Sequence, residues 1–177
     1  MLHVSTLLLC LALTWPRTAG AQDPRLEARL DSTTRTRVES VIAAARDAGL
    51  PTEPLVQKAL EGASKGAPGP RIAAAVEAMM SDLRTAREAL GPGAAPGDLV
   101  AAAAAMRAGA TPAMVGEMRR LAPRGGVAVP LAVFTDLVAG GMTVDTAWHS
   151  VDELARNGGD QQEFLDLRDR LGPGRAP

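Results

Sequence analysis

The side chains best suited to chemistry are spaced four residues apart near the C-terminal end of the sequence: Asp145, His149 and Glu153. On a helix, residues four apart share one face, so an imidazole would lie between two carboxylates. These groups bind divalent metal ions, and an imidazole beside a carboxylate can act as a general base. The spacing therefore defines a candidate metal or acid-base site, and a small metal-dependent or acid-base enzyme centred on His149 is one alternative function.

A solvated helix surface is the simpler interpretation of the same residues. His149 points away from most of the apolar face of its helix, which is formed by Val144, Ala147, Trp148, Val151 and Leu154. Charged side chains opposite an apolar stripe are typical of any surface helix. The sequence also lacks a nucleophile elbow and the glycine-lysine spacing of a phosphate loop. It therefore favours a non-catalytic role and predicts no cofactor.

Two groups of arginines are candidate sites for acidic partners. Arg119, Arg120 and Arg124 flank Pro123, and guanidinium groups bind phosphates or carboxylates through paired hydrogen bonds. A second group, within residues 25–37, is interleaved with aspartates and glutamates that largely cancel its charge. We therefore take Arg119, Arg120 and Arg124 as the interaction candidates, with an ordinary solvated surface as the alternative.

The methionines suggest a further alternative, an apolar-ligand carrier. Thioether side chains adapt their shape, so Met79, Met114, Met118 and Phe134 could line a cavity for an apolar ligand. Methionine as core filler is the simpler explanation, because the chain contains only two phenylalanines, two tryptophans and no tyrosine. So few rings also argue against base or sugar recognition by stacking.

Residues 1–21 have the pattern of a cleavable signal peptide. An apolar run, Val4 to Leu13, precedes the small residues Ala19-Gly20-Ala21, and signal peptidase requires small residues at its cleavage site. The run is about half the roughly 20 residues needed to span a bilayer. We therefore expect cleavage after Ala21, no integral membrane span afterwards, and a secreted or periplasmic protein. Cleavage would also remove Cys10, the single cysteine, so we expect no disulfide.

The charge balance argues against nucleic acid as a partner. The chain has 19 lysines and arginines and 20 aspartates and glutamates, so it has no general attraction for polyanions. The abundance of alanine, glycine, proline and arginine suggests a GC-rich bacterial genome. Together with the leader, this composition predicts a protein of the bacterial cell envelope.

The hydrophobic periodicity predicts an all-α fold. Apolar residues recur at helical spacing in segments separated by glycine and proline. We expect seven to eight short helices packed as antiparallel pairs around a long helix with its seam from Ile72 to Leu90. Residues 22–37 are expected to form a flexible polar arm, residues 38–171 a single helical domain, and residues 172–177 a disordered tail. Asp98 is expected to stabilise the positive end of its own helix, which begins at Pro96 or Gly97.

Similar joints recur between the predicted helices. Gly49, Gly109 and Gly141 are each followed by a hydrophobic residue and then by a residue suited to a helix start. Their intervals of 60 and 32 residues define no fixed period, so both an irregular helical bundle and a short helical-repeat-like array fit. Such a fold, without an evident catalytic set, predicts a non-catalytic binding or scaffolding module that contacts a protein or another envelope component.

Overall fold

The computed structural model describes residues 23–121 and 126–172, which contain helices and no strands. The all-α prediction is confirmed, with nine helices in these ranges. The signal peptide, Arg124 and nearly all of the predicted tail lie outside the described residues. Within the described part, no helix is both long enough and apolar enough to cross a membrane. The helices are α1 (Pro24–Glu27), α2 (Ser32–Asp47), α3 (Glu53–Ser64), α4 (Gly69–Leu90), α5 (Pro96–Arg107), α6 (Pro112–Leu121), α7 (Ala128–Ala139), α8 (Val144–Arg156) and α9 (Gln161–Leu171).

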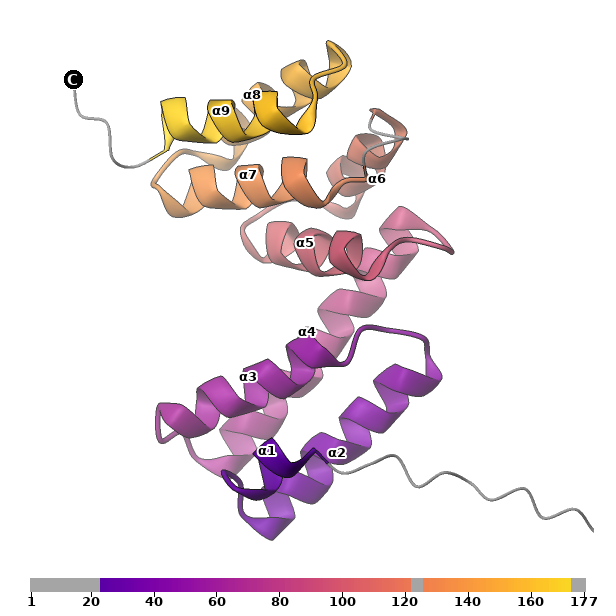
Figure 1. Ribbon diagram of the computed structural model, residues 1–177, viewed down its shortest axis with the longest axis vertical. Coiled ribbons are helices and arrows are strands. Elements are labelled where there is room, and N and C mark those ends of the chain that lie inside the picture. Colours follow the sequence, from indigo (N-terminus) through magenta and orange to yellow (C-terminus); the bar gives the residue numbers. More distant parts are fainter. Residues whose placement is uncertain (1–22, 122–125, 173–177) are drawn as a thin grey trace, which may run out of the picture.

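The helices stack in two layers. Figure 1 shows α3, α5, α7 and α9 following one another along the near side, with α4, α6 and α8 behind them. Helix α4 is the longest, at 22 residues, and it packs against α2, α3, α5 and α6. It therefore joins the N-terminal helices to the rest of the stack, as the sequence predicts for the long central helix.

The second half of the stack repeats. Helices α5 and α7 begin 32 residues apart, as do α6 and α8, and α9 begins 33 residues after α7. Helix α5 packs on α7 and α7 on α9, while α6 packs on α8. The glycine joints compared in the sequence hid this period, because the first of them, at Gly49, lies outside the repeating part. The structure thus favours the helical-repeat-like array over the irregular bundle.

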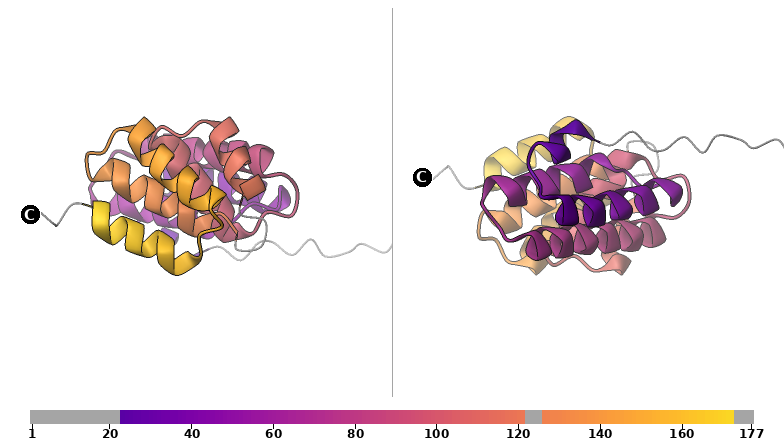
Figure 2. Two further views of the ribbon diagram at one scale, coloured as in Figure 1. Left: turned by 90° about the horizontal axis from the view of Figure 1, so that it is seen from above. Right: turned by 90° about the horizontal axis from the view of Figure 1, so that it is seen from below.

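Polar helices close both ends of the array. Figure 2 shows α8 and α9 at one end and α1, α2 and α3 at the other. Helix α9 buries Phe164 and Leu167 and exposes most of its charged residues. A capping helix with a polar outer face is what a stack of repeats needs in order to end in water.

The N-terminal segment differs from its prediction. Helix α2 begins at Ser32, and α1 precedes it, so most of the predicted flexible arm is helical. Leu26 is completely buried and Leu30 nearly so, and Asp31 caps α2 by accepting a hydrogen bond from the Thr34 amide at 3.0 Å. The arm was predicted because it has only two large apolar residues, but both of them pack into the shared core.

A buried carboxylate links the two repeating units. The side chain of Asp98, on α5, is only 7% exposed, and its Oδ1 accepts hydrogen bonds from the amides of Val127 and Ala128, each at 2.9 Å. The carboxylate therefore caps the start of α7 and not, as predicted, the start of its own helix. Gly126 has a φ of +70°, and a Cβ there would lie 2.9 Å from Asp98 Oδ1. Glycine is thus required for this close approach.

Candidate functional site

The residues predicted for metal or acid-base chemistry lie on an open surface. His149 on α8 is 81% exposed and Glu153 is 67% exposed, and the nearest His149 Nε2 to Glu153 carboxylate distance is 4.0 Å. Asp145 is exposed on the same helix. Across residues 23–121 and 126–172, no three histidine, cysteine, aspartate or glutamate side chains come close enough to hold a metal ion. The structure therefore does not assemble Asp145, His149 and Glu153 into the concave site that the enzyme alternative requires.

The arginine candidates are not assembled into one patch either. Arg119 Nη1 lies 3.9 Å from Asp98 Oδ2, and Asp98 already accepts two backbone hydrogen bonds. Arg120 is exposed at the end of α6. Arg119 therefore neighbours the carboxylate that caps α7, which gives it a structural contact that the sequence does not reveal.

The residues proposed for an apolar-ligand carrier contribute to the packed core. Met118 and Phe134 are completely buried, and the Phe134 ring contacts Trp148 edge to face, with centroids 5.8 Å apart. Met79 and Met114 are partly buried against the same core. These contacts support the simpler explanation of methionine as core filler.

The structure instead reveals a groove between α1, α2 and α3. Its volume is about 740 Å³, within the range of about 300–1,000 Å³ typical of ligand pockets. Leu26, Ile42 and Val56 are buried side chains that line it, one from each helix. The groove therefore has an apolar floor between walls that carry charged residues.

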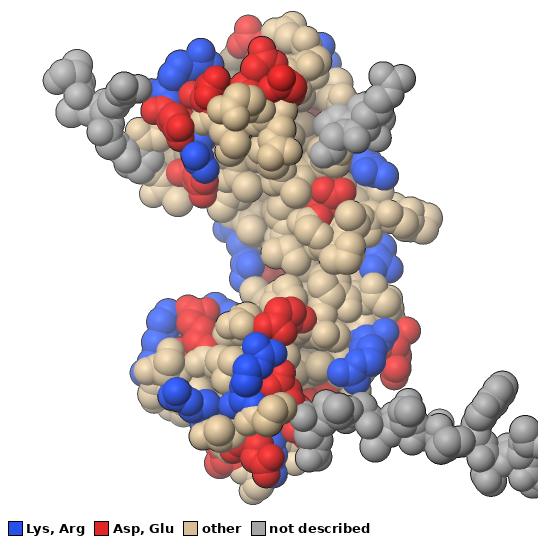
Figure 3. All heavy atoms as spheres, viewed as in Figure 1, with Lys and Arg blue, Asp and Glu red and all other residues tan. Residues whose placement is uncertain are grey.

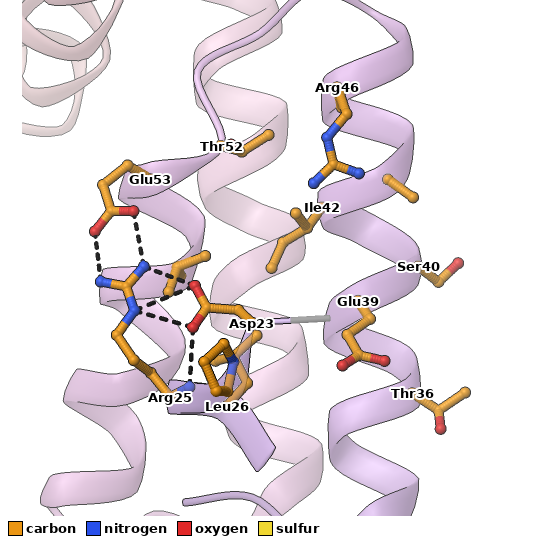
Figure 4. A pocket seen from close by; sticks show the side chains of 13 residues that line it. Asp23, Arg25, Leu26, Thr36, Glu39, Ser40, Ile42, Arg46, Thr52 and Glu53 are labelled. Carbon is orange, nitrogen blue, oxygen red and sulfur yellow. Dashed lines mark hydrogen bonds and ion pairs between the residues drawn. The ribbon is translucent and has the colours of Figure 1, made fainter. Parts of the chain in front are cut away.

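One wall of the groove is an ion cluster centred on Arg25 (Figure 4). The two terminal nitrogens of Arg25 each donate to a different oxygen of Glu53 at 2.9 Å, and one of them also donates to Asp23 at 2.7 Å. The hydrogen bonds from Arg25 lower the pKa of Glu53 to about 2 and also lower the pKa of Asp23. Since Glu53 is in the first turn of α3, the cluster ties α1 to α3.

The opposite wall is the exposed face of α2. Thr36, Glu39, Ser40, Ala43 and Arg46 line it at helical spacing. Glu39 Oε1 is buried and accepts no hydrogen bond within the described part of the chain. Arg46 is exposed and has no ion-pair partner in residues 23–121 and 126–172. This wall thus offers one negative and one positive group that the surrounding described residues do not neutralise.

Charged side chains concentrate near this end of the molecule. Figure 3 shows many of them over α1, α2 and α3 and over the α8 and α9 end, while the middle of the same face, over α5 and α7, is largely uncharged. Only Val100 and Leu171 are large apolar side chains with substantial exposure among the described residues. The α1–α3 groove is therefore where an apolar floor and charged groups occur together.

Sequence reasoning missed this groove because its walls are distant in the chain. Arg25 and Glu53 are 28 residues apart, and residues 22–37 were expected to be flexible. The periodicity of Val38, Ile42 and Ala45 did identify the buried face of α2, and that face places Glu39 and Arg46 at the groove. The missing information was the docked position of α1.

The ion cluster makes a testable contribution to stability. Arg25→Gln should lower the urea midpoint of unfolding near pH 7, since ionised Glu53 then loses its partner. The pKa of Glu53 is lower in the folded state than its usual 4.5, so this stabilisation is complete above about pH 5 and disappears as pH falls towards 2. Urea unfolding at several pH values should show the gap from wild type closing over that interval.

The matched control for this experiment is Arg29→Gln. Arg29 is an exposed arginine just beyond α1 that makes no ion pair with a described residue. Its substitution should leave the midpoint close to that of wild type at every pH. A gap for Arg25→Gln that stays constant from pH 7 to pH 2 would contradict the assignment of the effect to the Glu53 carboxylate.

Comparison with protein-family models, with curated proteins and with solved structures finds no match to this chain, so the functional argument depends on the groove itself.

Proposed function

We propose that the chain is an exported, non-catalytic binding module of the bacterial cell envelope, and that it holds a segment of a partner protein in the α1–α3 groove. The observation that carries the proposal is the groove's apolar floor beside Glu39 and Arg46, two charges without partners among the described residues. Apolar lining with a few placed polar groups is the usual composition of a binding site. The leader pattern of residues 1–21 supports the location in the envelope.

Helical-repeat architecture supports the same proposal. Stacked helix pairs present an extended surface and need no ligand to fold, since each pair buries its apolar face against the next. The ion cluster of Asp23, Arg25 and Glu53 holds α1 in place, so one wall of the groove is formed before a partner arrives. Such preorganisation reduces the entropy cost of binding.

Capture of a partner from the envelope fraction tests this function. The tagged mature chain should retain one or a few proteins reproducibly, and Ala43→Arg should abolish their retention because the long side chain fills the groove. Ala44→Arg is the matched control, since Ala44 is equally exposed on α2 but does not line the groove. Equal capture by the wild-type, Ala43→Arg and Ala44→Arg chains would show that the groove is not the binding surface.

A further inference from the structure

We infer that the segment held in the groove is the C-terminal tail of its partner, with the terminal carboxylate on Arg46 and a cationic side chain about three residues earlier on Glu39. This inference rests on the proposed function, since it names the partner segment for the same groove. It depends on the charges of the α2 wall, on their separation and on the shape of the groove near the end of α2.

The charges of the two walls differ in what they leave for a ligand. On the α1 and α3 side, Arg25 already binds both Asp23 and Glu53. On the α2 side, Glu39 and Arg46 have no such partners among the described residues. A buried acceptor without a hydrogen bond is costly, so a cationic group at Glu39 Oε1 would satisfy it. Arg46 requires an anionic group in turn, and its planar guanidinium matches a carboxylate.

The separation of these two charges matches a short extended peptide. Glu39 and Arg46 are seven residues apart on α2 and therefore lie about 10 Å apart along the helix, because an α-helix rises about 1.5 Å per residue. An extended chain rises about 3.3 Å per residue. The cationic and anionic groups of the ligand should therefore be about three residues apart.

The position of Arg46 favours a chain end over an internal acidic residue. Arg46 is the last residue of α2 that lines the groove, and Thr52, which immediately precedes α3, lines the groove as well. Figure 4 shows both residues near the same end, away from Leu26 and Thr36. The connection between α2 and α3 follows directly after Arg46, so a peptide lying along α2 has its natural terminus there.

Binding of a synthetic tail tests the inference. The probe is the N-acetylated peptide Ac-Ala-Lys-Ala-Leu-Ala with a free carboxylate, titrated calorimetrically into the mature chain. We expect a Kd on the order of 100 µM, typical of a short exposed contact. The C-terminal amide, and the analogue with glutamine in place of lysine, should each bind about fivefold more weakly, as expected for the loss of one partly exposed charge-assisted contact.

Variants of the protein assign each end of the peptide to its residue. With Arg46→Gln the acid and the amide should bind equally, and with Glu39→Gln the lysine and glutamine peptides should bind equally. Arg84→Gln and Glu88→Gln, at exposed positions on α4 outside the groove, should preserve both differences. Circular dichroism will verify that each variant is folded.

The outcomes separate this inference from the proposed function. No binding of the acid peptide, or binding of the acid and the amide with the same Kd by the wild-type chain, would overturn the inference of a C-terminal tail. If Ala43→Arg nevertheless abolishes capture of an envelope protein, the groove still binds a partner and only the identity of the segment is wrong. Peptide binding without any protein captured from the envelope would instead contradict the proposed function.

Discussion

Replacing Asp98 with alanine is expected to lower the free energy of unfolding by about 3 kcal/mol, since it leaves the amides of Val127 and Ala128 without their acceptor. The Val127 amide is buried, so water cannot easily replace the carboxylate. The substitution also removes a negative charge from the positive end of α7, where a charge contributes roughly 0.3–1 kcal/mol. Urea unfolding followed by circular dichroism measures the change.

Two further variants identify the cause of this effect. Asp98→Asn keeps an oxygen acceptor and loses only the charge, so we expect a loss of about 1 kcal/mol. Asp136→Ala removes an exposed aspartate from α7 itself and should change stability by no more than about 0.5 kcal/mol. If Asp98→Ala were as stable as Asp136→Ala, the carboxylate would not be the cap that joins α5 to α7.

The second large effect is expected at Leu26. Leu26→Ala should cost about 3 kcal/mol, the usual loss for a fully buried leucine, because this side chain is 0% exposed in the core. Leu26 also lines the groove, so the variant should bind the tail peptide more weakly than wild type. Urea unfolding measures the first effect and calorimetric titration of the peptide measures the second.

The matched control for Leu26 is Leu171→Ala. Leu171, at the end of α9, is 43% exposed, so its truncation should cost less than about 1 kcal/mol. It lies outside the groove and should leave peptide binding unchanged. If Leu26→Ala cost no more than Leu171→Ala, α1 would be undocked in solution, as the sequence alone suggests.

The sequence predicts the helices well wherever the signal is local. The predicted helices from Pro112 to Leu121 and from Val144 to Ala155 match α6 and α8 to within one residue. Gly49, Gly109 and Gly141 all have positive φ, as the predicted joints require. Periodicity and punctuation depend on neighbouring residues, and neighbouring residues are what a sequence displays.

Features that depend on distant contacts could not be predicted in this way. Nothing near Leu26 indicates that it will be buried, and nothing near Asp98 indicates that its carboxylate will cap a helix beginning 30 residues later. The groove is a third example, since α1, α2 and α3 each contribute only part of it. Conversely, Asp145, His149 and Glu153 do share a helix, but a shared helix face does not create a concave site.

The measurement that tests the central claim most directly is cross-linking in the producing cell from a photoreactive residue at position 43, compared with the same residue at position 44. The account predicts that position 43, inside the groove, forms a cross-link to an envelope protein through that protein's C-terminal residues, and that position 44 does not. Equal cross-linking from both positions, or cross-linking from position 44 alone, would contradict the claim that the α1–α3 groove is the binding site.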